Sequence, residues 1–107
     1  MVAGFSEVKQ HVNAFYELAS ASLPIKKVLL YGSWAKGTPR KDSDIDVAVV
    51  IDSRDHSRRL DIGAQLFHYA IPIDTRIEPR CIFWDEYQNP EPASILAEII
   101  RTGIEIV

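Results

Sequence analysis

The sequence has only one cysteine, Cys81, among its 107 residues. One thiol can form neither an internal disulfide nor a cysteine-based zinc site, and we expect a protein of the reducing cytoplasm. The histidines, His11, His56 and His68, lack the spacing of metal ligands. No apolar run approaches the roughly 18–20 residues that cross a bilayer, and the N-terminus lacks a signal-peptide pattern, so we expect no membrane association.

An excess of positive charge is also missing. Twelve Lys and Arg residues stand against fifteen Asp and Glu residues, which gives a net charge of −3. This balance argues against a general role in nucleic-acid binding, although a local basic patch remains open. With 47% hydrophobic and 25% charged residues the composition is that of a globular protein, and the length predicts a single domain over residues 1–107.

Hydrophobic periodicity divides the chain into helices and strands. Apolar residues at steps of three and four predict helices over residues 6–19, from Ser57 to about Tyr69, and over 93–102. Short apolar or alternating runs predict strands over residues 25–31, 45–51 and 73–77, with a short edge strand at 104–107. The continuously apolar end of 45–51 indicates a central strand that is buried on both faces. The order of the strands and the roles of 52–59 and 81–87 stay open.

The stretch from residue 31 to 47 contains the residues that suggest chemistry. Gly32-Ser33 follows the first predicted strand, where a sharp turn can present bare backbone amides to a phosphate. A helical turn over 34–37 would aim further amides at the same place. Asp44 and Asp46 begin the next strand. Because residues two apart on a strand point the same way, both carboxylates can converge on one hard cation.

Transfer of a nucleotidyl group usually needs a third carboxylate, and we predict that Asp74 supplies it from the strand over 73–77. Arg76 shares that face and either pairs with Asp74 or contacts phosphate. The alternative is that these aspartates are ordinary solvated residues at strand ends. If Asp74 is dispensable, Asp42 or Glu78 is the next candidate.

Further residues of the same stretch are candidate nucleotide ligands. Ser33 can bind a terminal phosphate, or it can simply cap the short helical turn. The basic residues Lys36, Arg40 and Lys41 lie in the loop where a triphosphate would lie, although exposed basic residues are often only solvated. Trp34 can stack on a base, but an aromatic residue beside a turn more often packs on its own domain.

This pattern resembles a known family. Gly32-Ser33, the gap to Ser43-Asp44-Ile45-Asp46 and the later Asp74 are similar to the signature of the polymerase-beta-type nucleotidyltransferases, and more narrowly of the minimal nucleotidyltransferase (MNT) proteins. The resemblance implies an α/β (α+β) fold, with a small mixed β-sheet palm flanked by helices. It also implies two Mg²⁺ ions at Asp44, Asp46 and Asp74, with nucleotide phosphates on Gly32 and Ser33.

The resemblance further implies an activity and a partner. ATP is the usual donor in this family, and AMP is transferred to a hydroxyl group. MNT proteins are typically antitoxins of HEPN-domain ribonuclease toxins, and the acceptor is then a tyrosine of the toxin. Larger members carry an extra helical domain for the acceptor, so we expect a partner to complete this site. Two alternatives remain: a catalytically silent subunit that neutralises its partner by contact, and a transferase that acts on a small hydroxylated substrate.

Overall fold

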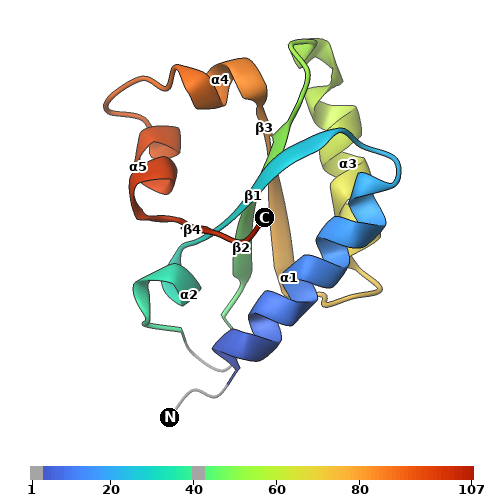
Figure 1. Ribbon diagram of the computed structural model, residues 1–107, viewed down its shortest axis with the longest axis vertical. Helices are drawn as coiled ribbons and strands as arrows, with labels where there is room; N and C mark the ends of the chain where they lie inside the picture. Colours follow the sequence, from blue (N-terminus) through green and yellow to red (C-terminus); the bar gives the residue numbers. More distant parts are fainter. Residues whose placement is uncertain (1–3, 40–42) are drawn as a thin grey trace.

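The computed structural model describes residues 4–39 and 43–107, and these form one four-stranded sheet in the order β3-β2-β1-β4 (Figure 1). The strands are β1 (Ile25–Tyr31), β2 (Ile45–Ile51), β3 (Ile77–Phe83) and β4 (Ile104–Glu105). Strand β1 is antiparallel to β2 and β4, whereas β2 and β3 are parallel. The sheet is therefore mixed, as the family resemblance implies.

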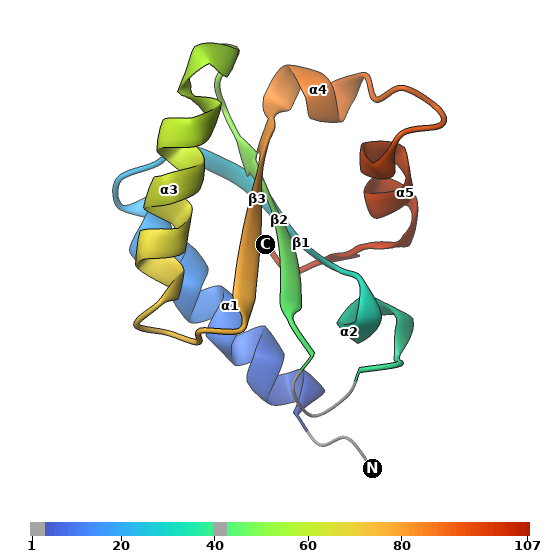
Figure 2. The ribbon, with the colours of Figure 1, turned by 180° about the vertical axis from the view of Figure 1, so that it is seen from behind.

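Helices cover both faces of this sheet. Figures 1 and 2 show α1 and α3 on one side, and α4 and α5 on the other. The bounds are α1 (Phe5–Ser20), α2 (Ser33–Lys36), a 3₁₀ turn (His56–Arg58), α3 (Arg59–Ala70), α4 (Trp84–Gln88) and α5 (Ile95–Thr102). Within residues 4–39 and 43–107 no helix combines the length and the apolar character that crossing a bilayer requires.

Strand β2 is the centre of the core. Val47 and Val49 pack with α1 and α3, while Ala48 and Val50 pack with Leu29 and Ile99 on the opposite face. All four of these β2 side chains are fully buried, which confirms the predicted central strand. Burying each valine stabilises the fold by about 1.5–3 kcal/mol. Because β2 is buried in this way, its first residues, Ile45 and Asp46, have a fixed position at the edge of the core.

The helices agree with the predicted periods, but their ends differ from the prediction. Helix α1 begins at Phe5 with Gly4 as its N-cap and no side-chain cap, so Ser6 lies inside the helix. Helix α5 begins at Ile95 rather than near residue 93, because the Ser94 hydroxyl accepts a hydrogen bond of 3.1 Å from the Ala97 amide.

The prediction of a strand over residues 73–77 is wrong. Asp74 Oδ1 accepts a hydrogen bond of 2.9 Å from the Arg76 amide, and this side-chain turn replaces extended pairing. The strand instead begins at Ile77 and continues through Pro79. Proline is tolerated there because β3 is an edge strand, where one side of the backbone needs no donor for the sheet.

Asp74 joins helix α1 to the turn that precedes β3. Its Oδ2 lies 2.9 Å from His11 Nδ1 and accepts a hydrogen bond of 2.8 Å from Arg76 Nη2, and its Oδ1 accepts one of 3.1 Å from Arg76 Nε. The predicted Arg76–Asp74 pair is thereby confirmed. The Asp74 side chain is only 9% exposed. The Arg76 guanidinium holds the pKa of Asp74 well below its usual range despite the opposing effect of burial.

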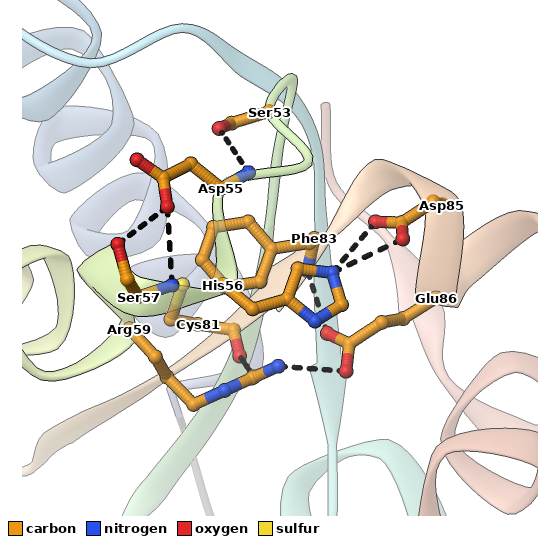
Figure 3. A network of polar contacts seen from close by, with 9 residues as sticks. All are labelled: Ser53, Asp55, His56, Ser57, Arg59, Cys81, Phe83, Asp85 and Glu86. Atoms are coloured by element: carbon orange, nitrogen blue, oxygen red, sulfur yellow. Dashed lines mark hydrogen bonds and ion pairs between the residues drawn. The ribbon is translucent and has the colours of Figure 1, made fainter.

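Residues 52–59 and 81–87, to which the sequence assigned no role, pack against each other (Figure 3). The His56 ring stacks on Phe83 with the ring centroids 4.7 Å apart, and its Nε2 lies 3.0 Å from both carboxylate oxygens of Asp85. Arg59 donates a hydrogen bond of 2.6 Å to Glu86. These contacts bind the start of α3 to the end of β3 and to α4, at the end of the sheet away from Asp46.

The Asp74 cluster leads to a prediction about stability. We expect Asp74→Asn to lower the free energy of unfolding by about 2 kcal/mol at pH 7, because it removes a charge that is nearly buried between two partners. A lowered folded-state pKa means that the carboxylate stabilises the fold above its ordinary pKa of 3.8. The difference between wild type and variant should therefore shrink as the pH falls below about 4. Urea unfolding at several pH values measures it.

Glu17→Gln, an exposed change on the same helix as His11, is the matched control and should leave unfolding unchanged. Equal stability of wild type and Asp74→Asn at pH 7 would contradict the role given to this cluster.

Candidate functional site

The site is built around Gly32, whose missing side chain leaves space for the carboxylate of Asp46. Gly32 follows β1 with φ 76°, a left-handed conformation that favours glycine. A Cβ at this position would come within 3.0 Å of Asp46 Oδ2. The residue is therefore required both for the turn and for the space that Asp46 occupies. The sequence predicted the turn but not this contact.

Asp46 has two acidic neighbours at the open end of β2, Asp44 and Glu78. In the sheet register Asp46 lies opposite Tyr31 of β1 on one side and Glu78 of β3 on the other. Asp44 lies two residues before Asp46 in the chain. Burial raises the pKa of Asp46, the charges of Glu78 and Asp44 raise it further, and Arg80 opposes them. Clustered carboxylates that disfavour each other's charge are the arrangement that a cation relieves.

A hollow of about 320 Å³ opens beside these carboxylates. Its walls come from the ends of β1 and β2, from β3 and from helix α3, and include Tyr31, Asp46, Phe67, Glu78 and Arg80. Arg80 Nε donates a hydrogen bond of 3.2 Å to the Tyr31 hydroxyl. The hollow therefore offers two carboxylates and one guanidinium to whatever enters it.

Asp74 lies in different surroundings from Asp46. Its neighbours are Arg76 and His11, whereas those that act on Asp46 are Glu78, Asp44 and Arg80. The structure thus brings together Asp44 and Asp46 but adds Glu78 where the sequence suggested Asp74. The signal for Glu78 was present, because apolar and other residues alternate from Ile77 to Cys81. Pro79 concealed it, since proline argues against a strand.

The predicted phosphate ligands lie at helix α2. Ser33 is its first residue, and Gly32 rather than Ser33 is the N-cap. The Ser33 hydroxyl makes no hydrogen bond to any residue that the structure describes, so it is open to a ligand. Lys36 is exposed at the end of this helix. Arg40 and Lys41, with Asp42, lie outside the described residues.

Trp34 does not offer its face to a base. Its side chain is only 4% exposed and belongs to the core on the side of α1 and α3. Its indole Nε1 donates a hydrogen bond of 3.5 Å to the Ser43 carbonyl oxygen, which fixes the chain just before Asp44. This confirms the prediction that an aromatic residue here packs on its own domain.

The donor set fits a cation that is shared with a nucleotide. Within residues 4–39 and 43–107, no three His, Cys, Asp or Glu side chains are placed to hold a metal ion by themselves. Mg²⁺ is commonly bound by one or two carboxylates together with substrate phosphates. Asp44 and Asp46, with Gly32 and the free Ser33 hydroxyl nearby, form such an incomplete set.

Known proteins share both the sequence and the fold. Residues 14–107 match the family described as polymerase beta, nucleotidyltransferase. A candidate protein adenylyltransferase from Methanocaldococcus jannaschii is 31% identical over 88 residues, which cover 77% of this chain and 85% of that protein. The family match spans the carboxylate strand and the glycine turn together.

Solved structures show the same fold. A candidate nucleotidyltransferase from Sulfolobus solfataricus has a TM-score of 0.70 at 16% identity, over 94% of this chain and 80% of the other. A toxin–antitoxin structure with AMP-PNP has a TM-score of 0.56 at 19% identity, over 92% of this chain and 72% of the other. The sequence match and the fold agree with the resemblance carried by residues 32–46, and the chain therefore belongs to the polymerase beta nucleotidyltransferase family.

Proposed function

We propose that this protein transfers AMP from Mg²⁺-bound ATP to a hydroxyl group of a partner protein. The observation that carries the proposal is the pairing of Asp46 with Glu78 across two parallel strands, with Asp44 beside them and Gly32 against Asp46. The acidic neighbours of Asp46 disfavour its charge, and a bound cation would relieve this repulsion. Membership of a nucleotidyltransferase family supports nucleotidyl transfer as the reaction that these carboxylates serve.

The roles of the residues follow from their places. Asp44 and Asp46 would hold Mg²⁺, which supplies neutralising charge to the phosphates when it is bound. The Gly32 backbone and the Ser33 hydroxyl bind phosphate oxygens, and Lys36 adds positive charge. Arg40 and Lys41, which lie outside the described residues, are assigned the same role from the sequence alone. We assign the role of the third carboxylate to Glu78 and not to Asp74, because both carboxylate oxygens of Asp74 already make hydrogen bonds with His11 or Arg76.

The reaction is a displacement at the α-phosphorus. The acceptor oxygen forms a bond to this phosphorus, and the bond from the phosphorus to the bridging oxygen of the β-phosphate breaks. Pyrophosphate leaves with that electron pair. The proton of the acceptor hydroxyl passes to the Glu78 carboxylate, which lines the same hollow as Asp46. AMP remains on the acceptor.

The acceptor that we propose is a tyrosine of a HEPN-domain toxin, which makes this chain an antitoxin that acts by AMPylation. Two comparisons support this. The relative from M. jannaschii is a candidate protein adenylyltransferase, and toxin–antitoxin structures, including a mutant of MntA-HpeT with a TM-score of 0.54, share the fold. The open hollow at Asp46 leaves room for a side chain from a second protein.

The first test compares the two candidate third carboxylates. The protein is incubated with α-labelled ATP, Mg²⁺ and the product of a neighbouring reading frame, and label on the second protein is measured. We expect Glu78→Gln to reduce transfer at least about 100-fold, because it removes the acceptor for the hydroxyl proton. Asp74→Asn should retain the activity of its folded fraction.

Two controls complete this test. Asp44→Asn should abolish transfer through loss of a metal ligand, while Glu91→Gln, an exposed change far from the carboxylates in sequence, should have no effect. If label never appears on the second protein and Asp44→Asn still neutralises it, then contact alone is the function. Loss of transfer in Asp74→Asn but not in Glu78→Gln would restore Asp74 as the third carboxylate.

The second test uses the stability of the protein without its substrate. A raised pKa means that the fold disfavours the charged form of Asp46, so Asp46→Asn should stabilise the protein at pH 7. We expect a rise in Tm of roughly 2–4 °C, corresponding to about 0.5 kcal/mol after allowance for solvent screening. The gain should vanish at acidic pH, where the wild-type carboxyl is protonated in both states.

The same variant should no longer gain stability from Mg²⁺ with AMP-PNP, whereas the wild type should melt at a higher temperature in their presence. Asp52→Asn, an exposed change just beyond the other end of β2, is the matched control and should keep the shift. A variant that melts below the wild type without nucleotide would contradict the electrostatic account of Asp46.

A further inference from the structure

A second hollow shares Tyr31 with the first. Its volume is about 240 Å³, and it opens between the start of α2 and helix α5. Figures 1 and 2 both show these two helices next to each other on the same side of the sheet. Gly32 and Lys36 line it from one side, and Ile95, Glu98 and Thr102 line it from α5.

Gly32 connects this hollow to the carboxylates. The residue lines the second hollow, and its Cα faces Asp46 so closely that a Cβ would clash with the carboxylate. Tyr31, immediately before it, lines both hollows. A nucleotide with its phosphates at Gly32 would thus lie next to both hollows, and only the first is lined by Asp46 and Glu78.

The lining of the second hollow suits a flat ring. Ile95 is 63% exposed, although it lies on a helix that otherwise packs through residues such as the buried Ile99, which also lines the hollow. An apolar surface of this kind gains free energy when a ring covers it. The volume is below the roughly 300–1,000 Å³ of pockets for whole drug-sized ligands, so it matches one part of a nucleotide.

The polar groups of the hollow accept rather than donate hydrogen bonds on the α5 side. Glu98 is exposed, and its carboxylate makes no hydrogen bond or ion pair with any residue among 4–39 and 43–107. The Thr102 hydroxyl donates a hydrogen bond of 2.8 Å to the Glu98 carbonyl oxygen, which leaves its own oxygen as an acceptor. Lys36, on the Gly32 side, supplies the positive charge that suits a phosphate.

We propose that this hollow holds the nucleoside of the donor nucleotide, with the Glu98 carboxylate accepting a hydrogen bond from it. The proposal rests on the proposed function, because it takes the phosphates to lie at Gly32. A nucleoside presents two kinds of donor to a carboxylate, the exocyclic amine of the base and the hydroxyls of the ribose. The hollow between α2 and α5 therefore sets which nucleotide this protein uses, while the hollow at Glu78 is left for the acceptor.

The experiment measures nucleotide binding by the whole chain in the presence of Mg²⁺, by calorimetry. We expect Glu98→Gln to weaken the binding of AMP-PNP about 10-fold, because the hydrogen bond loses the charge of its acceptor. The affinity for inorganic triphosphate, which has no nucleoside, should stay the same. Glu91→Gln, also acidic and exposed but outside the hollow, is the matched control and should bind both ligands as the wild type does.

Two further ligands separate the two donors. If Glu98 binds the ribose, 2′-deoxy-ATP should bind the wild type more weakly than ATP, and this difference should be smaller in Glu98→Gln, whose uncharged amide oxygen accepts a weaker hydrogen bond. If Glu98 binds the base amine, the triphosphate of purine riboside, which lacks that amine, should bind the wild type more weakly than ATP. This difference in affinity should again be smaller in Glu98→Gln. Either result supports the proposal.

The outcomes that overturn the inference differ from those that overturn the proposed function. Wild-type affinity of Glu98→Gln for AMP-PNP would disprove the place of the nucleoside, and the transferase reaction would stand. If the wild type binds neither AMP-PNP nor inorganic triphosphate, the site does not take nucleotides, and the proposed function falls with the inference.

Discussion

The close approach of Gly32 and Asp46 is the constraint on which the rest of the site depends. The Asp46 carboxylate fills the space that any side chain at position 32 would need. The turn that could bind phosphate and the carboxylate that could bind metal thus lie next to each other, because glycine leaves room for the carboxylate. The buried valines of β2 hold Asp46 in position, because the strand cannot move without breaking the core.

The parallel pairing of β2 and β3 converts this contact into a cluster of carboxylates. In a parallel pair Asp46 lies opposite Glu78, and the first residues of both strands reach the same end of the sheet. Burial disfavours the charged form of Asp46, the neighbouring carboxylates Glu78 and Asp44 add to this cost, and together they raise its pKa. The opposite end of the sheet has no such cost, since there the acidic residues Asp85 and Glu86 are paired with His56 and Arg59. The acidic side chains at that end thus have basic partners, whereas Asp46 lies among other acidic residues, where we expect a cation to bind.

Much of the fold could be predicted from local patterns. The period of the apolar residues indicated α1, α3 and α5, and the apolar run of β2 indicated a strand buried on both faces. These succeeded because the same side chains that set the period also form the core. The strand after α3 was misplaced because Ile73, Thr75 and Ile77 alternate as a strand would. The Asp74 side chain bonded to the Arg76 amide instead and ended the extended conformation.

The sequence by itself determined the chemistry of residues 32–46: a turn that requires glycine and two carboxylates that alternation turns to one face. Both properties are local, since they follow from backbone conformation and from the repeat of a strand. Only the tertiary structure decided which third acidic residue meets them, because Glu78 lies thirty-two residues beyond Asp46 and reaches it through the register of two strands. Register depends on the packing of the whole sheet against its helices, and no local pattern contains it.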